Sequence, residues 1–181
     1  MKALLTGASN PHGRAIAEAL LSAGHDVRLF GGEPGDLDGL EGLGGQVRWH
    51  PGQLEVGGSI EPVLSQREVL IHAANLDVLH QKVKDKHAAA VRIERGTLYT
   101  RYGAEREMVD LFVHVAPAGG DKVWGQVQEQ ATAHAKAARG VEVTVVNAAA
   151  DPAATAKAVM DAVGKGRLYG TPPGKTVGVT A

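Results

Sequence analysis

The sequence predicts a single three-layer α/β/α domain in which helices cover both faces of a doubly wound parallel sheet. Two observations carry this prediction. Short runs rich in Leu, Val and Ile alternate along the chain with longer Ala-rich stretches of helical periodicity, which is typical of parallel α/β sheets. A turn that contains two glycines follows the first apolar run directly, at residues 6–13. Because no linker, repeat or low-complexity segment interrupts the alternation, residues 1–181 are expected to form one domain.

The N-terminal part is expected to contain three short strands, each an apolar run bounded by turn residues. These runs are residues 3–5, 27–30 and 47–49. A helix is predicted at residues 14–23, because apolar residues recur there every three or four positions until Gly24 ends the pattern. Residues 31–45 are rich in Gly and Asp and are expected to form a loop with at most a weak helical turn. A short helix is predicted at residues 60–64.

The C-terminal part continues the alternation with three further strands and three helices. The strands are apolar runs at residues 69–72, 111–115 and 141–146. The helices are expected at residues 87–107, 123–138 and 152–163. The first of these helices carries Arg and Glu side chains along much of its length, which is typical of a solvated face. From residue 166 onward the chain is expected to form a short extended tail.

The composition excludes several classes of function. The 181 residues carry a formal net charge of −1, so no overall positive field favours nucleic acid as a partner. Cysteine is absent, which excludes disulfides, thiolate catalysis and cysteine-ligated zinc. The eight histidines form neither a His-x-His nor a His-Glu-x-x-His pattern, so no metal site is predicted. No apolar run is long enough for a signal peptide or a membrane span, and a soluble, cytoplasmic protein is expected.

Short motifs occur in a definite order along the chain. They are Leu-Leu-Thr-Gly-Ala-Ser-Asn-Pro-His-Gly at residues 4–13, Val-Leu-Ile-His-Ala-Ala at residues 69–74, Gly-Thr-Leu at residues 96–98 and Phe-Val-His-Val at residues 112–115. Their order and spacing resemble those of the extended and atypical short-chain dehydrogenases/reductases, the group that contains the NAD-dependent epimerases and dehydratases. The resemblance implies a Rossmann-like fold that binds NAD or NADP where the strand order reverses. It also implies a homodimer through the two long helices, and the family's C-terminal substrate-binding lobe is expected to be largely missing.

The resemblance places the dinucleotide on the turn after the first strand. Gly7 and Gly13 occupy the first and third glycine positions of the family's Thr-Gly-x-x-Gly-x-x-Gly pattern, and Asn10 occupies the middle one. Glycines let the backbone approach the pyrophosphate, while the following helix N-terminus donates hydrogen bonds. Asn tolerates left-handed backbone angles, but its side chain is expected to take space that the pyrophosphate uses. The residues expected to contact the cofactor are Gly7, Ser9, Asn10, Pro11, His12, Gly13, Gln53, Leu54, Ala73 and Ala74.

A second interpretation of this turn requires no ligand. Its glycines would then serve only to let the strand and the helix pack closely, and a Gly-rich turn alone does not distinguish the two cases. Pro11 removes one N–H donor from the helix N-terminus. His12 is expected to be a partly exposed turn histidine, with a phosphate contact as the alternative.

The residues that would select the cofactor differ from those of the family. Gly31 and Gly32 stand after the second strand, where an acidic residue would hold the ribose of NAD or an Arg would hold the 2′-phosphate of NADP. The nearest acidic residue, Glu33, lies two residues after the position at which the family has its acidic residue. Gln53 stands where the family has an Asp that reads the adenine amino group, and its amide can still form a hydrogen bond. NAD and NADP therefore both remain open, as does binding itself.

The catalytic Ser, Tyr and Lys of the family have no counterparts at the matching positions. The segment after the fifth strand reads Ala116-Pro117, and the segment that resembles Tyr-x-x-x-Lys begins with Trp124 and ends with Gln128. An indole N–H and an uncharged amide cannot exchange a proton with a substrate. Trp124 is expected to be a core or interface aromatic at the start of a helix. The resemblance thus implies a non-catalytic member that serves as a nucleotide-sensing, regulatory or partner subunit.

Two alternatives stay open at this point. The first is an atypical NAD(P)-dependent oxidoreductase or epimerase that takes its acid/base group from an unusual position, such as His72, His114 or Tyr99. The second is a structural or interaction protein that binds no cofactor. His72 and His114 lie in predicted strands and are more simply explained as histidines of the core or of the sheet edge.

Overall fold

The computed structural model describes residues 1–32, 34–77, 85–117 and 122–166. A six-stranded sheet with the order β3-β2-β1-β4-β5-β6 forms the middle layer. The strands are β1 (Lys2–Thr6), β2 (Asp26–Phe30), β3 (Gln46–His50), β4 (Val69–His72), β5 (Leu111–Ala116) and β6 (Glu142–Asn147). Every neighbouring pair runs parallel, and the order reverses between β1 and β4. The predicted doubly wound α/β fold is therefore confirmed.

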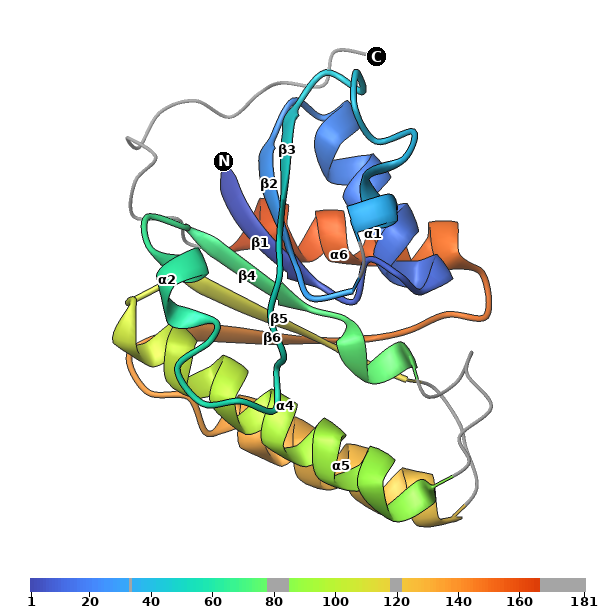
Figure 1. The fold of residues 1–181 in the computed structure, drawn as a ribbon, viewed down its shortest axis with the longest axis vertical. Coiled ribbons are helices and arrows are strands. Elements are labelled where there is room, and N and C mark those ends of the chain that lie inside the picture. The colour runs from blue at the N-terminus through green and yellow to red at the C-terminus, as the bar shows by residue number, and fades with distance from the viewer. Residues whose placement is uncertain (33, 78–84, 118–121, 167–181) are drawn as a thin grey trace.

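Helices cover both faces of the sheet, as Figure 1 shows. One face carries α1 (Pro11–Ser22) and α6 (Pro152–Lys165), and the other carries α2 (Glu61–Leu64), α4 (Lys86–Arg106) and α5 (Lys122–Lys136). Two short 3₁₀ turns complete the described elements, η1 (Pro34–Leu37) and η2 (Ala74–Leu76). The long helices α4 and α5 lie side by side, and none of the helices described is long and apolar enough to cross a membrane.

Two hydrophobic cores hold the layers together, because successive side chains of a strand point to opposite faces of the sheet. Ala3 and Leu5 of β1 face α1 and α6, whereas Leu4 faces α2, α4 and α5; all three side chains are fully buried. Strands β4 and β5 are buried along their whole length. A strand that is covered on both faces reads as a continuous apolar run, which is why the sequence predicted these strands correctly.

Helix α1 begins at Pro11, three residues before the predicted start. Asn10 caps it, because its side-chain oxygen accepts a hydrogen bond from the Gly13 N–H at 2.8 Å. Proline suits the first helical position, where no N–H is needed. The expected loop at residues 31–45 contains one 3₁₀ turn, η1, and the predicted tail lies outside the described residues beyond Gly166.

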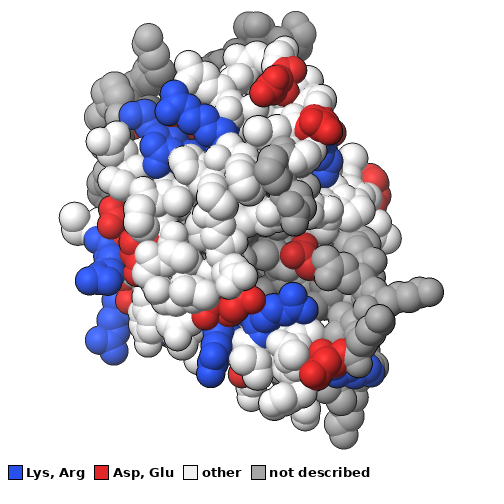
Figure 2. Space-filling view, viewed as in Figure 1, with Lys and Arg blue, Asp and Glu red and all other residues white. Residues whose placement is uncertain are grey.

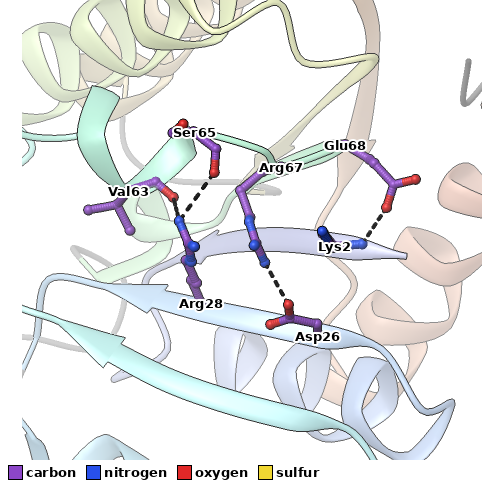
Figure 3. Close-up of polar contacts among 7 residues, drawn as sticks. All are labelled: Lys2, Asp26, Arg28, Val63, Ser65, Arg67 and Glu68. Atoms are coloured by element: carbon purple, nitrogen blue, oxygen red, sulfur yellow. Dashed lines mark hydrogen bonds and ion pairs between the residues drawn. The ribbon is translucent and has the colours of Figure 1, made fainter. Parts of the chain in front are cut away.

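Charged side chains fasten the segment before β4 to the neighbouring strands (Figure 3). Arg67 is almost fully buried and forms an ion pair with Asp26 at 3.0 Å. Arg28 donates to the carbonyl oxygens of Val63, at 2.8 Å, and Ser65, at 3.3 Å. Lys and Arg side chains gather at the upper left of Figure 2, on the side where Figure 1 places β2 and β3. Arg28 and Arg67, which contact or belong to β2, therefore have a structural role.

Candidate functional site

A cleft of about 550 Å³ opens at the carboxyl ends of β1, β2 and β4, at the point where the strand order reverses. Ligands of open α/β sheets bind at such a point. The described residues that line it are Gly7, Ser9, Phe30, Gly31, Gly32, Gly52, Gln53, Leu54, Glu55, Ala74, Asn75, Asp77, Ala89, Arg92, Ile93 and Gly96. They come from the turn after β1, the end of β2, the loop after β3, η2 with its flanking residues, and α4.

The cleft contains only half of the residues that the sequence suggested for a cofactor. Those that line it are Gly7, Ser9, Gln53, Leu54 and Ala74. Those that do not are Asn10, Pro11, His12, Gly13 and Ala73. Glu33, the late acidic candidate, lies outside the described residues. The lining polar side chains that the sequence did not single out are Glu55, Asn75, Asp77 and Arg92.

Gly7 and Gly13 are required by close backbone packing. Gly7 has a φ of +82°, and a Cβ atom there would lie 2.5 Å from the Ala74 nitrogen. A Cβ atom on Gly13 would overlap the carbonyl oxygen of Gly7 and lie 2.6 Å from its carbonyl carbon. The two glycines therefore bring the turn after β1 against η2 on one side and against α1 on the other. Gly7 also lines the cleft, so the packing role and a role beside a ligand do not exclude each other.

Asn10 differs from its predicted role in two respects. Its φ of −92° is extended, so no left-handed geometry is needed at this position. Its side chain is 3% exposed and points inward, where the amide nitrogen donates to Ala73 O at 3.1 Å and to Asp77 Oδ1 at 2.7 Å. Asn10 is not among the residues that line the cleft, and the expectation that its side chain takes up pyrophosphate space stays a prediction.

Replacement of Asn10 with Gly, the residue that the family pattern has there, is expected to destabilise the fold by about 2–3 kcal/mol, because three hydrogen bonds are lost, two of them buried. Asn10→Ser serves as the matched control, since a serine can still cap α1 but cannot reach Ala73 or Asp77, and an intermediate loss is expected. Urea unfolding at neutral pH measures both. If Asn10→Gly were as stable as the parent protein, the inward hydrogen bonds would not hold this turn.

His12 is buried, contrary to the prediction of a partly exposed histidine. It is 5% exposed, and its Nε2 lies 3.0 Å from the carbonyl oxygen of Ala149. Because a carbonyl only accepts, Nε2 carries the proton and donates. The chain after β6 covers the first turn of α1, which no pattern near His12 could reveal. His12 thus joins α1 to the segment after β6 and does not face the cleft.

The end of the cleft formed by β2 and the loop after β3 contains an aromatic ring and three glycines beside the polar Gln53 and Glu55. The Phe30 ring packs so closely on Gly52 that a Cβ atom there would overlap the ring. Gly31 and Gly32 lie beside it without side chains, and Gln53 provides an amide group. Such a surface suits an aromatic base. Arg92 is the single cation among the lining residues described.

A buried polar network lies behind the cleft. His72 is fully buried; its Nδ1 lies 2.9 Å from Thr6 Oγ1, and its Nε2 lies 3.2 Å from Asn75 Oδ1. Since the amide oxygen can only accept, Nε2 donates to it and Nδ1 accepts from the threonine hydroxyl. Asn75 in turn donates to Thr97 Oγ1 at 3.0 Å. The network holds Asn75 in the wall of the cleft.

His72 stacks on a second buried histidine, His114, with 5.7 Å between the ring centroids. Burial, and the neighbouring imidazole of His114, lower the pKa of His72 to about 3, and burial lowers the pKa of His114 to about 4. Both are therefore neutral core residues at neutral pH, as their positions in strands suggested. Neither lines the cleft.

The positions that the sequence resemblance pairs with the family's catalytic residues lie in two different places. Ala116, Pro117 and Gln128 line a separate groove of about 530 Å³ along α5. Trp124 does not; it is partly buried against Ile93 and neighbouring apolar residues of α4 and α5, in agreement with its predicted role as a core or interface aromatic. Among the residues described, no group of three or more His, Asp or Glu side chains could hold a metal ion.

Comparisons with known proteins identify the fold. No protein-family model matches the chain, and no curated protein matches it in sequence. Among solved structures, an alcohol dehydrogenase from the archaeon Thermococcus sibiricus, complexed with 5-hydroxy-NADP, has a TM-score of 0.70 at 16% identity, over 90% of each chain. A metagenomic short-chain oxidoreductase in complex with NADP has a TM-score of 0.66 at 18% identity, again over 90% of each chain.

The similarity extends to a longer protein of the same fold. The Bordetella bronchiseptica enzyme WbmG, in complex with NAD, has a TM-score of 0.65 at 18% identity over 81% of this chain and 52% of that one. At these identities the similarity defines the fold, which is that of the short-chain dehydrogenases/reductases. The resemblance seen in the order of the motifs is thereby confirmed at the level of the fold.

Proposed function

We propose that this chain binds NAD or NADP in the cleft at the carboxyl ends of β1, β2 and β4 and acts as a nucleotide-sensing, regulatory or partner subunit without hydride-transfer chemistry of its own. The proposal rests on a well-formed cleft beside Gly7 and Gly13, together with the side chains of Ala116, Trp124 and Gln128 at the positions that resemble the family's catalytic ones. The fold similarity to proteins solved with NADP or NAD supports the choice of ligand.

The cleft supports dinucleotide binding through its size and its two chemically different ends. A volume of about 550 Å³ lies within the ordinary range of small-molecule sites. Gly7 and Ser9 offer backbone and hydroxyl groups at the helix N-terminus, where a phosphate is favoured. Phe30 and Gln53 offer a ring and an amide, which suit an adenine base.

Residues outside the cleft also support the absence of catalysis. Ala116 and Trp124 stand where the family has Ser and Tyr, and neither can move a proton. His72 and His114 are buried away from the cleft and neutral. Tyr99 lines a different surface depression, together with Gly57, and so is not placed to act as an acid or base in the cleft. These positions disfavour the alternative of an oxidoreductase with an unusual acid/base residue.

The proposal is tested by thermal unfolding in the presence of NAD⁺, NADH, NADP⁺, NADPH, FAD and ADP-ribose. A ligand at about 100 times its dissociation constant adds about 2.7 kcal/mol to stability, so a shift of the unfolding midpoint is expected with at least one nicotinamide dinucleotide. No turnover is expected with a panel of carbonyl and alcohol substrates. The absence of any shift would favour a cofactor-free interaction protein, and sustained turnover would favour an atypical oxidoreductase.

Charge reversal of Arg92 is expected to weaken dinucleotide binding at least tenfold, because Arg92 is the one described lining cation and the ligand carries a diphosphate. Arg95→Glu is the matched control: Arg95 is exposed on the same helix but does not line the cleft, and a change of less than twofold is expected. Equal effects of Arg92→Glu and Arg95→Glu in a calorimetric titration would place the ligand elsewhere.

We further propose that two copies associate through α4 and α5, as the family resemblance implies. The two helices lie side by side on one face of the sheet, and Tyr102 on α4 is 41% exposed with Arg101 stacked over its ring. Light scattering behind a sizing column measures the mass, and a mass of one chain over the micromolar range would exclude this dimer.

A further inference from the structure

One face of β3 is not covered by a helix. Val47 and Trp49 point to the side of the sheet on which α1 and α6 pack, and they join the core there. Gln46, Arg48 and His50 point to the opposite side, because side chains alternate along a strand, and none of them joins the core beneath α2, α4 and α5. The connection from β3 to β4 contains a single short helix, α2, so this part of the sheet stays open, with Gln46 and Arg48 exposed.

The open face of β3 lies in electropositive surroundings. Arg28 of β2 is the register partner of Arg48, on strands about 4.8 Å apart, and like charges at such a spacing repel. Arg67 is almost fully buried next to Arg28, as Figure 3 shows. Burial lowers the pKa of His50, and the charges of these three arginines lower it further. This face therefore favours an anionic partner.

The nearby carboxylates do not neutralise this face. Asp26 forms its ion pair with Arg67, and Glu68 accepts a hydrogen bond from the backbone of β1. Arg28 donates to two carbonyl oxygens, which carry no net charge. Arg48 makes no hydrogen bond or ion pair with any residue described. Because both carboxylates are engaged, the exposed guanidinium of Arg48 remains open to an acidic group from outside.

The backbone of β3 is also open to a partner, because β3 is an edge strand. Its neighbour on one side is β2, and no described residue pairs with its other side. Alternate N–H and C=O groups of such a strand point outward and can pair with another extended chain. A segment that adds to the sheet there places every second side chain on the open face, beside Arg48.

Charge distinguishes among the extended chains that could occupy this edge. A second copy that added its own β3 would bring two Arg48 side chains together, which is unfavourable. Residues 167–181 contain Arg167 and Lys175 but no acidic residue, so the C-terminal segment of this chain does not supply a counter-charge. A nucleic acid supplies negative charge but has no peptide groups to pair with the edge. A protein segment with acidic side chains meets both requirements.

We propose that the outer edge and open face of β3 form a docking site for an extended acidic segment of a partner protein. The segment adds to the sheet beside β3 and places its carboxylates against Arg48 and Arg28. No described residue that lines the dinucleotide cleft belongs to β3, so this site does not depend on the dinucleotide binding proposed above.

The docking site is tested by titrating the full chain with the capped peptide Glu-Val-Glu-Val-Glu, with the backbone amide signals of β3 in nuclear magnetic resonance as the readout. Saturable shifts of these signals are expected, together with slower hydrogen exchange of the outward N–H groups of β3. The peptide Lys-Val-Lys-Val-Lys lacks the negative charge, and the acidic peptide with all of its backbone nitrogens methylated cannot donate to the edge. Neither of these two control peptides is expected to bind.

Charge reversal in the chain tests the role of Arg48. Arg48→Glu is expected to weaken binding of the acidic peptide at least tenfold. Lys157→Glu makes the same change in net charge at an exposed lysine of α6, on the other face of the sheet, and is expected to change binding less than twofold. Arg92→Glu, which alters the dinucleotide cleft, is also expected to change peptide binding less than twofold, so the two proposals fail independently.

Three outcomes would overturn the docking site. The first is the absence of any saturable shift with the acidic peptide at millimolar concentration. The second is equal binding by the lysine peptide or by the methylated peptide. The third is the same effect of Arg48→Glu and Lys157→Glu. A short oligothymidylate that bound β3 more tightly than the acidic peptide would identify nucleic acid as the partner and would also overturn the proposal.

Discussion

Alanine at Gly13 is expected to cost about 3–4 kcal/mol of unfolding free energy, a loss that approaches the whole stability of a marginal domain. Its Cβ atom would overlap the carbonyl oxygen of Gly7, and the next atom, the Gly7 carbonyl carbon, would be 2.6 Å away. Both are backbone atoms, so no side chain can rotate to relieve the contact. Relief requires α1 to move away from β1, and Ile16 and Leu20 of that helix are fully buried in the core.

Alanine substitutions at two other glycines distinguish the cost of a close contact from the cost of a left-handed backbone angle. Gly24 has a φ of +78°, and a Cβ atom there would have nothing within 4 Å, so Gly24→Ala is expected to cost about 1 kcal/mol from the left-handed angle alone. Gly7 combines a positive φ with a Cβ atom 2.5 Å from Ala74 N, and Gly7→Ala is expected to equal or exceed Gly13→Ala. Urea unfolding of the three variants gives the comparison. If Gly13→Ala lost no more unfolding free energy than Gly24→Ala, the turn after β1 would be able to open freely.

Acidification from pH 7.5 to pH 4.5 is expected to remove about 5 kcal/mol of stability through two residues, His72 and His114. Their pKa values are about 3 and about 4 in the fold, against an ordinary histidine value of 6.5. A lowered folded pKa means that the unfolded chain binds more protons, so stability falls as the pH drops below about 6.5 and continues to fall towards the folded values. Over two pH units this amounts to about 2–3 kcal/mol for each histidine.

The variant His114→Leu isolates this effect. Leucine is similar in size to histidine, and His114 Nδ1 has no partner among the residues described, so little is lost at pH 7.5. The loss of stability between pH 7.5 and pH 4.5 is expected to shrink by about half, since one titrating group is gone. His87→Gln is the control, because His87 is exposed. An unchanged pH dependence in His114→Leu would mean that the buried imidazole is not the acid-sensitive group.

Local sequence by itself determined the order of the elements, the parallel doubly wound sheet and the position of His72 and His114 in strands. These features follow from the periodicity of apolar residues and from their position within continuous apolar runs. The importance of Gly7 and Gly13 was also evident, because a βα turn that packs closely leaves no room for a Cβ atom.

Only the tertiary structure decided where the polar side chains of the site point. Asn10 turns inward because Ala73 and Asp77, more than sixty residues away, offer it partners. His12 is buried by a segment 137 positions along the chain. Arg92 lies in a charge pattern typical of a solvated face, yet the fold brings it to the cleft. Such contacts depend on which distant segments pack together in the fold, and the local spacing of residues along the chain does not specify this.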